Sequence, residues 1–390
     1  MTILHITSGD DKYGSALALR ELLEREVEND VVPVVVSPRK NSFTEYCENK
    51  GIKCYVIYYE WSQIPKHNIA PIFAMKYLLR QFLYHTKNPK AERLLEEIIV
   101  KEKVDLVHTN SMVVDVAGKV ATKYGLPHVW HLRELLKENY NCYPIHKDYI
   151  NRMSSDNSFF LAVSEFTKTV WTGLGIDSKR ISVIYDGVDA ERFTMNSEKD
   201  VKSVDKADVL RMVMCGSFCE AKGQKLLVKA ISRLNEDERK QISIAMYGNT
   251  EGTYYSETVK MINDLKVDDS FEIKGYSNNI PEELQCYSCG VMCSENEAFG
   301  RVTVEYMLAG LCPIVPDAGA NRELTNNGEF AILYDRRNAD GLTEAIRKII
   351  ANKELVDAYG IKGREYAKTK FDVNSNILSL LGFFGAACSK

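Results

Sequence analysis

Residues 291–310 read VMCSENEAFGRVTVEYMLAG, a sequence that passes from a strand through a glycine-containing turn into an amphipathic helix. We expect the strand at Val291–Cys293 and the helix at Val302–Ala309. At the start of that helix, unpaired backbone N–H groups and the positive end of the helix dipole form a seat for phosphate near Phe299. The segment therefore predicts an α/β fold with an anion-binding loop after a strand.

The same alternation of strand and helix extends in both directions from this segment. Continuous β-branched runs such as Val31–Val36 are typical of strands buried on both faces of a sheet. Strands that alternate with helices predict parallel, doubly wound sheets, so the expected fold class is α/β. Further strands are expected at Ile3–Thr7, Lys53–Tyr58, Val104–Thr109, His128–His131, Phe159–Val163, Ile181–Ile184, Leu210–Cys215, Ile242–Tyr247, Phe271–Lys274 and Pro313–Val315.

A polar segment divides this alternation into two halves. Residues 196–208, NSEKDVKSVDKAD, carry many charges and few apolar side chains, the profile of a linker. We therefore predict a Rossmann-like domain at 1–195, this linker, and a second Rossmann-like domain at 209–390, whose last helix, about 371–387, is a candidate to pack back on the first. Open α/β sheets bind ligands beyond the carboxyl ends of their strands, so two facing sheets predict a site in the cleft between them.

The composition is that of an ordinary globular protein, with 45% hydrophobic and 27% charged residues in a chain of 390. The net charge of −4 argues against a nucleic-acid partner. The N-terminus lacks the features of a secretory signal, and no apolar run of about 18 residues predicts a membrane-spanning helix. We expect reduced cysteines in a cytoplasmic protein, and no metal site at Cys286, Cys289 and Cys293, which lack a nearby fourth ligand.

Two carboxylates flank the predicted phosphate seat. Glu297 lies before the helix and Glu305 lies inside it. Both are better suited to accept hydrogen bonds from the hydroxyl groups of a sugar or a ribose than to bind phosphate. Taken singly, Glu297 could equally be a charge that favours the helix N-terminus, and Glu305 part of a solvated helix face.

The whole string EAFGRVTVEYMLAG resembles the E-x7-E signature of the retaining GT-B glycosyltransferases of family 4. The resemblance covers nearly the whole chain and implies a GT-B fold, in which two Rossmann-like domains face each other across a cleft. In that family the first glutamate contacts hydroxyl groups of the donor sugar and the second binds the nucleotide ribose, and these roles would fall here to Glu297 and Glu305. The amides that would face the diphosphate are those of Phe299, Gly300 and Arg301.

A second match is MCGSFCEAKGQ, residues 214–224, which resembles the family's G-R-L-x-x-x-K-G element. The resemblance implies that Lys222 offsets charge on the departing diphosphate and that Gly216 and Ser217 line the donor site. Ser217 stands where the family usually carries arginine, so one cationic group of the pattern is absent. Candidates to replace it are Arg301 and Arg133, and slower turnover is the alternative.

Two further loops carry donor-site candidates through the same resemblance. Tyr276 and Ser277 follow the expected strand at Phe271–Lys274, in the loop that holds the nucleotide base in the family. Gly14 and Ser15 match a small-residue pair after the first strand, where the backbone approaches the donor phosphate. An ordinary turn is the alternative for both loops.

The strand expected at His128–His131 ends with two more candidates. His131 matches a histidine that lies near the donor sugar in the family, and Arg133 is a candidate contact for phosphate or for an anionic acceptor. A histidine satisfied within the core is the alternative reading of His131.

The resemblance implies a retaining glycosyltransferase that moves a hexose or N-acetylhexosamine from a nucleotide diphosphate sugar to an acceptor hydroxyl, in cell-surface polysaccharide or glycolipid synthesis. A UDP-linked donor is favoured over a GDP-linked one, and no cofactor or obligatory metal is implied. The catalytic candidates are Glu297, Lys222 and His131. The alternative, raised by Ser217, is a non-catalytic or partner-dependent subunit that binds a sugar nucleotide.

The segment Trp61–Ala91 concentrates basic charge, since it contains five lysines and arginines and no acidic residue. It is also rich in aromatic residues, and its apolar residues have helical spacing over Ile72–Tyr84. Such a helix could lie on an anionic membrane at the inner face of the cell membrane and admit a lipid-linked glycan acceptor. An ordinary helix with solvated lysines is the alternative.

Overall fold

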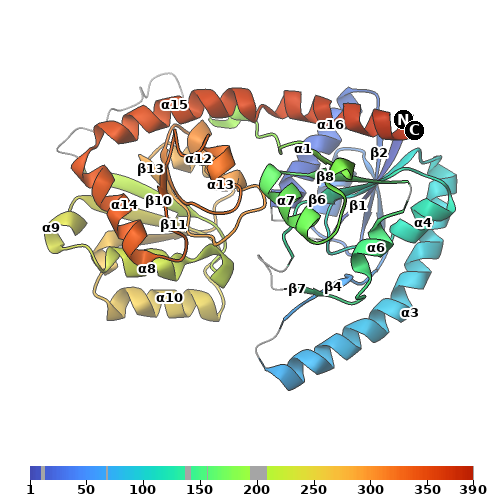
Figure 1. Cartoon of the computed structure of the whole chain (residues 1–390), viewed down its shortest axis with the longest axis horizontal. Coiled ribbons are helices and arrows are strands. Elements are labelled where there is room, and N and C mark those ends of the chain that lie inside the picture. Colours follow the sequence, from blue (N-terminus) through green and yellow to red (C-terminus); the bar gives the residue numbers. More distant parts are fainter. Residues whose placement is uncertain (10–13, 67–68, 137–141, 156, 194–208, 390) are drawn as a thin grey trace. The chain divides into compact units, whose positions relative to one another are not determined.

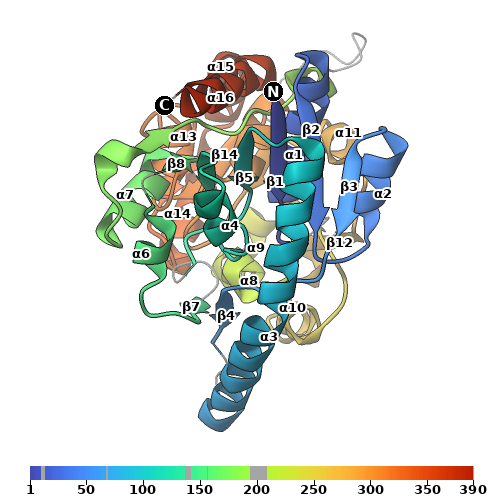
Figure 2. The same ribbon diagram turned by 90° about the vertical axis from the view of Figure 1, so that its right-hand side faces the viewer.

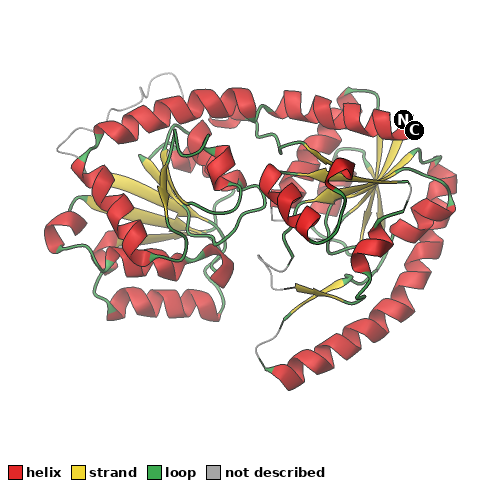
Figure 3. Cartoon of the chain, in the orientation of Figure 1, coloured by secondary structure: helices red, strands yellow, loops and turns green. Residues whose placement is uncertain are grey.

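The structure is a computed structural model in which the described residues are 1–9, 14–66, 69–136, 142–155, 157–193 and 209–389 (Figure 1). The chain forms two units, of which the first comprises Met1–Gly187 with Val373–Lys390 and the second Val188–Asp372. Each unit has a parallel sheet with helices packed around it (Figure 3). The predicted linker at 196–208 lies outside the described residues.

A seven-stranded parallel sheet with the order β3-β2-β1-β5-β6-β8-β9 forms the centre of the first unit. The chain order reverses between β1 and β5, so the carboxyl ends of these strands mark the switch point of a doubly wound sheet. The strands are β1 (Thr2–Ile6), β2 (Val32–Ser37), β3 (Lys53–Val56), β5 (Leu106–Thr109), β6 (His128–Leu132), β8 (Ser158–Ala162) and β9 (Ile181–Val183), with a separate antiparallel pair, β4 (Gln63–Pro65) and β7 (Cys142–Pro144).

Helices cover both faces of this sheet. On one face, Ile3 and Leu106 pack in one cluster with Leu19 of α1 and Phe384 of α16, so the last helix belongs to the first unit. On the other face, Val107 packs with residues of α3 and α4. The helices of this unit are α1 (Gly14–Glu28), α2 (Ser42–Asn49), α3 (Ala70–Glu102), α4 (Gly118–Lys123), α6 (Tyr149–Met153), α7 (Glu165–Gly173) and α16 (Val373–Cys388).

Helix α3 is a single helix of 33 residues, which contains the segment Ile72–Tyr84 where the sequence indicated helical spacing. Pro89 lies inside it on the exposed side, so the carbonyl of His85, which loses its helical partner, can meet water. Its C-terminal half is anchored in the core by residues such as Leu95 and Ile98. Figure 2 shows α3 beside α4, with its first turns extending past the sheet.

A six-stranded parallel sheet with the order β12-β11-β10-β13-β14-β15 forms the centre of the second unit. Here the chain order reverses between β10 and β13. The three residues of β15 carry no turn or periodicity that would mark them as a strand in the sequence. The strands are β10 (Leu210–Cys215), β11 (Ile242–Tyr247), β12 (Phe271–Gly275), β13 (Cys289–Val291), β14 (Cys312–Pro316) and β15 (Ile332–Tyr334).

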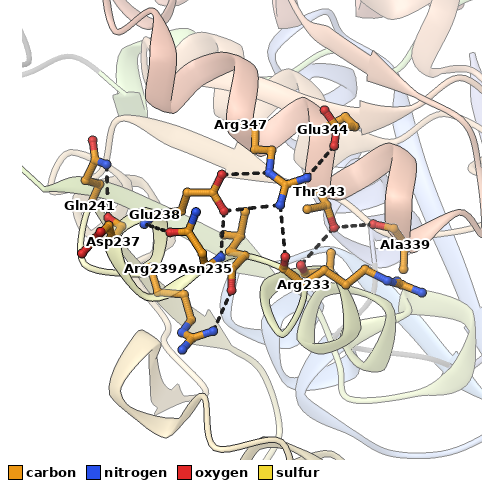
Figure 4. Close-up of polar contacts among 12 residues, drawn as sticks. Arg233, Asn235, Asp237, Glu238, Arg239, Gln241, Ala339, Thr343, Glu344 and Arg347 are labelled. Atoms are coloured by element: carbon orange, nitrogen blue, oxygen red, sulfur yellow. Dashed lines mark hydrogen bonds and ion pairs between the residues drawn. The ribbon is translucent and has the colours of Figure 1, made fainter.

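Polar contacts join helices at the rim of this unit (Figure 4). Asn235 and Glu238 form a reciprocal capping box at the start of α9. The guanidinium of Arg347 in α14 donates to Glu238 at 2.9 Å and to the carbonyl of Arg233 at 3.1 Å. The helices are α8 (Gln224–Ile231), α9 (Glu236–Arg239), α10 (Thr253–Asp264), α11 (Ile280–Leu284), α12 (Arg301–Leu308), α13 (Asn321–Leu324), α14 (Ala339–Ala351) and α15 (Glu354–Lys370).

The division between the units falls after Gly187, whereas the sequence placed a boundary after residue 195. The reason is η2 (Ala190–Phe193), a 3-10 helix that packs against α11 and α12 of the second unit and buries Phe193. The other 3-10 helices are η1 (Ser178–Arg180), η3 (Glu220–Lys222) and η4 (Asp268–Ser270). Among the described residues, no helix combines the length and the apolar character needed to cross a bilayer.

Candidate functional site

Lys222 and Glu297 meet at the switch point of the second unit. Lys222 follows β10 and Glu297 follows β13, and these strands are neighbours in the sheet. The Nζ atom of Lys222 lies 2.6 Å from Oε1 of Glu297. Burial alone would lower the pKa of Lys222, but the Glu297 carboxylate outweighs this effect, so the pKa of the ammonium is raised and its charge is retained. The side chains remain 33% and 15% exposed, which leaves the pair open to a ligand.

Two glycines allow the loops around this pair to approach one another. A Cβ atom on Gly223, whose φ is +72°, would lie 2.5 Å from the carbonyl oxygen of Cys293. A Cβ atom on Gly319, whose φ is +62°, would lie 2.5 Å from the backbone nitrogen of Glu297. Neither backbone atom can rotate out of the way, so a larger residue at either position would displace the loop that carries Lys222 or Glu297.

The predicted phosphate seat is the N-terminus of α12. Gly300 is its N-cap with a φ of +86°, and Thr303 donates its N–H to the Gly300 carbonyl at 2.8 Å. Nε of Arg301 lies 3.1 Å from Oε1 of Glu305, one turn along the helix. Phe299 is buried against Phe371, with ring centres 5.8 Å apart. The N-terminal turn of α12 therefore carries a positive backbone dipole and an internally paired side-chain charge.

Tyr306 fixes α12 to the sheet, a role that the sequence did not indicate. Its hydroxyl accepts the N–H of Cys215 at 2.8 Å, and its ring occupies the space that a side chain on Gly290 would fill. One end of β10 and the middle of β13 are thus held against the residue next to Glu305. The only sign of this role in the sequence was a tyrosine among the apolar residues of the predicted helix, because a buried tyrosine usually finds a hydrogen-bond partner.

The remaining donor-site candidates of the second unit follow β10 and β12. The carbonyl of Ser217 accepts a hydrogen bond from Gln224 at 3.0 Å, and Gly216, with a φ of +153°, lies directly before it. Tyr276 is 63% exposed, and the hydroxyl of Ser277 accepts the N–H of Asn279 at 3.1 Å. Strand β11 lies between β12 and β10, so Tyr276 and Ser277 follow a strand that is not a direct neighbour of the one that leads to Lys222.

The candidates of the first unit gather at its own switch point. Gly14 and Ser15 begin α1, and the carbonyl of Ser15 accepts a hydrogen bond from Asn110 at 3.1 Å. Asn110 in turn accepts from Nε of Arg133 at 2.9 Å, and Nη1 of Arg133 lies 2.5 Å from Oδ2 of Asp186. Arg133 is therefore buried and paired, and Asp186 supplies its counter-charge.

Both arginines that could replace the cationic group absent at Ser217 already form ion pairs within the protein. Arg301 is paired with Glu305 in the second unit, and Arg133 is paired with Asp186 in the first. A bound phosphate would have to compete with these carboxylates for either guanidinium.

Two family models match consecutive parts of the chain. The model described as Glycosyltransferase Family 4 matches residues 18–192, and the model described as Glycosyl transferases group 1 matches residues 196–366. The chain belongs to the family 4 glycosyltransferases. Its two α/β units, each built on a sheet of parallel strands, have the architecture of the GT-B fold.

Over the aligned residues, curated relatives of this glycosyltransferase are about a quarter identical to it. An uncharacterised glycosyltransferase of Methanocaldococcus jannaschii is 24% identical over 358 residues, which is 87% of this chain and 93% of the relative. The N-acetylgalactosamine-N,N'-diacetylbacillosaminyl-diphospho-undecaprenol 4-alpha-N-acetylgalactosaminyltransferase of Campylobacter jejuni is 24% identical over 195 residues. That alignment spans only 50% of each chain.

The fold is also that of a solved structure. HepE from Anabaena, solved in complex with UDP, superposes with a TM-score of 0.78 at 20% identity, covering 99% of this chain and 100% of HepE. At this identity the likeness establishes the architecture, and the chemistry has to be argued from the residues of this chain.

His131 lies in the core of the glycosyltransferase near the carboxyl end of β6. It is 2% exposed, and its Nδ1 atom lies 3.0 Å from Nε2 of His108. Burial, together with the charge of Arg133, lowers the pKa of His131, so the ring is neutral at physiological pH. The sequence did not indicate that the rings of His131 and His108 are joined by a hydrogen bond.

Proposed function

We propose that this glycosyltransferase moves a sugar from a nucleotide diphosphate donor to an acceptor hydroxyl, with retention of the anomeric configuration. The observation that carries the proposal is the contact between Lys222 and Glu297 beside the N-terminus of α12. A charged ammonium, the N-terminal turn of a helix and a partly exposed carboxylate are the groups that a sugar diphosphate requires within one site. The complex of HepE with UDP supports a UDP-linked donor over a GDP-linked one.

In this mechanism the second unit stabilises the leaving group. The bond from the anomeric carbon to the diphosphate breaks with its electron pair on the diphosphate, and Lys222 and the amides of Phe299, Gly300 and Arg301 offset that charge. The acceptor oxygen bonds to the anomeric carbon and passes its proton to a donor phosphate oxygen. Glu297 accepts hydrogen bonds from the donor sugar and Glu305 from the ribose. We propose no cofactor and no obligatory metal, because these groups supply the positive charge.

Removal of the Glu305 carboxylate tests the donor site. Glu305→Ala should abolish turnover of nucleotide sugars and weaken donor binding in a thermal-shift titration. Glu295→Ala is the matched control, because Glu295 lies in the loop before α12 and pairs with Arg337 at the surface. Full turnover by the Glu305 variant would refute the assignment.

The alternative is a non-catalytic or partner-dependent subunit that binds a sugar nucleotide. The observation in its favour is Ser217, because both candidate replacement arginines are already paired. A panel of donors and acceptors distinguishes the two functions. Donor binding without transfer or hydrolysis would support the alternative, and restoration of turnover by Ser217→Arg would show that the missing cation is the cause.

We further propose that the enzyme binds the inner face of the cell membrane through α3 and takes a lipid-linked glycan acceptor there. Four apolar residues at helical spacing, Met75, Leu78, Leu79 and Phe82, form a stripe in which each side chain is more than half exposed. Such spacing normally marks the side of a helix that faces a core. The acceptor named for the Campylobacter relative, a diphospho-undecaprenol glycan, supports a lipid-linked acceptor.

The other contacts of α3 leave this stripe exposed. Phe73 and Tyr77 pack on the opposite side, where Phe73 lies 5.8 Å from the ring of Tyr143 and the Tyr77 hydroxyl donates to the Ile145 carbonyl at 3.1 Å. Arg80 is paired with Glu60 at 2.6 Å. The remaining lysines of the helix N-terminal to Ala91 are exposed and complement anionic lipid, namely Lys76, Lys87 and Lys90.

Vesicle sedimentation tests the membrane proposal. The protein should bind vesicles that contain phosphatidylglycerol, bind less at high salt, and lose binding in the double variant Leu79→Glu/Phe82→Glu. Leu94→Glu is the control, since Leu94 is an exposed leucine of the same helix outside the stripe. Equal binding by the double variant, or a dimer that the double variant dissociates, would assign the stripe to another role.

A further inference from the structure

Three buried histidines and one glutamate form a continuous row of hydrogen bonds across the sheet of the first unit. Oε2 of Glu26 lies 2.9 Å from Nε2 of His5, Nδ1 of His5 lies 2.9 Å from Nδ1 of His108, and Nε2 of His108 lies 3.0 Å from Nδ1 of His131. Glu26, His5 and His108 are fully buried, and His131 is 2% exposed.

The register of the sheet explains how this row forms. His5 and His108 are direct partners in the β1–β5 pair. His108 is opposite Val129 in β6, and His131 follows on the same face two residues later. Helix α1, which carries Glu26, and α16, whose Phe384 ring lies 5.3 Å from that of His108, cover this face.

Both ends of the row carry an atom without a hydrogen-bond partner among the described residues. These atoms are Oε1 of Glu26 and Nε2 of His131. His131 lines a cavity of about 20 Å³, which also contacts Glu21, Arg133 and Asp186. A cavity of that size has room for roughly one small polar group or water molecule. The row therefore runs from the apolar core to a small cavity near the carboxyl end of β6, where apolar residues of α1 and α16 and a few polar groups surround Nε2 of His131.

A row of this kind has two self-consistent arrangements of protons. When Glu26 is ionised, Nε2–H of His5 donates to it, Nδ1–H of His108 donates to His5, and Nδ1–H of His131 donates to His108, so Nε2 of His131 is an acceptor. When Glu26 is protonated, every bond reverses and Nε2–H of His131 is a donor. The two arrangements differ by one proton, and all three rings are neutral in both.

We propose that Glu26, His5 and His108 form a proton relay that sets whether His131 offers a hydrogen-bond acceptor or a donor to the pocket at the end of β6. One proton added at Nε2 of His131 is matched by transfer of a proton along each hydrogen bond, and the last of these transfers leaves a proton on Glu26. Glu26 is thus a positioning residue that acts through two rings. Its role in sugar transfer rests on the proposed function and on the family resemblance, which implies that His131 lies near the donor sugar.

The surroundings of the row favour neutral imidazole rings. Burial lowers the pKa values of His108 and His131, which disfavours an imidazolium at either ring. The charged and titratable groups that line the cavity beside His131 are Arg133, which is paired with Asp186, Glu21 of α1, and Tyr185. His128 of β6, whose pKa burial lowers to about 3, lies on the opposite face of the sheet, where its Nε2 atom is 2.8 Å from Oγ1 of Thr109.

Histidine 15N NMR of the full chain tests the relay, because it reports which ring nitrogen carries the proton. Across the pH range in which the protein is folded, His5, His108 and His131 should exchange tautomers together at one midpoint. In Glu26→Gln the side chain has no carboxyl proton to gain or lose, and its amide can accept from or donate to His5, so the tautomer populations of the three rings should not change with pH. Glu28→Gln, an exposed glutamate of the same helix, is the matched control and should behave as the wild type.

Rings that titrate at separate midpoints, tautomers that do not change with pH in the wild type, or an unchanged transition in Glu26→Gln would each overturn the relay. This readout does not depend on turnover. If the proposed function holds, the pH profile of kcat should share the midpoint of the tautomer exchange and lose it in Glu26→Gln. If no donor is ever turned over, the proposed function fails while the tautomer result still decides the relay.

Discussion

Removal of one oxygen atom from Tyr306 tests whether this residue holds α12 in place. Tyr306→Phe leaves the ring in the space beside Gly290 and deletes only the hydroxyl, which accepts the N–H of Cys215 at 2.8 Å and donates to the Val291 carbonyl at 3.4 Å. A buried backbone N–H that loses its partner costs about 1–3 kcal/mol. Cys215 is half-buried, so we expect the lower part of that range, about 1–2 kcal/mol. For a unit of this size each kcal/mol lowers Tm by roughly 2–4 °C.

Thermal and urea unfolding of the purified variant provide the measurement. Tyr334→Phe is the control, because Tyr334 is also buried and its hydroxyl donates to the Met292 carbonyl at 2.8 Å. That variant leaves an acceptor unpaired, which is tolerated better than an unpaired donor, so its loss of stability should be smaller. A Tyr306→Phe protein as stable as the wild type, or a larger loss in Tyr334→Phe, would show that the hydroxyl does not fix the helix.

Three further predictions concern other parts of the structure. Gly319→Ala should lower stability by about 1–3 kcal/mol and weaken donor binding, because the new Cβ would meet the Glu297 nitrogen at a positive φ; calorimetry and titration measure both effects. Burial raises the pKa of Asp115 from 3.8 to about 6. The stabilisation from its protonated carboxyl is therefore fully present below pH 3.8 and is lost as the pH rises through about 6. Measurements of unfolding at several pH values should show that this dependence of stability on pH disappears in Asp115→Asn. Arg347→Ala should cost no more than about 1 kcal/mol in denaturant unfolding, since its pairs lie partly exposed at the rim.

The sequence was sufficient to predict the architecture of both units, because the patterns that mark strands and helices lie within short segments of the chain. Buried parallel strands appear as continuous apolar runs such as Val34–Val36, and the helices between them have a clear period. The exceptions are elements whose local signal misleads. Proline disfavours a helix interior, yet α3 continues through Pro89, because this residue lies on the exposed side of the helix, where the lost hydrogen bond can be replaced by water.

The site was predictable only in part, because its contacts join residues far apart in the chain. The E-x7-E string located α12, and the family pattern linked it to Lys222, whose contact with Glu297 no spacing rule could supply. The counter-charge of Arg133 and the histidine row depend on strand register, which sets which side chains are neighbours across a sheet. The histidines could have been noticed as polar residues within otherwise apolar strands.

The position of α16 has a consequence for how the protein is made. The first unit begins at Met1, yet part of its core is Ile377, Leu380 and Phe384 near the other end of the sequence. A ribosome therefore has to synthesise the whole of Val188–Asp372 before these side chains exist. During translation the later unit can complete its fold first, while the earlier one keeps the α16-binding face of its sheet uncovered. A nascent chain stalled before residue 373 should thus be a preferred client of chaperones that bind exposed apolar surface.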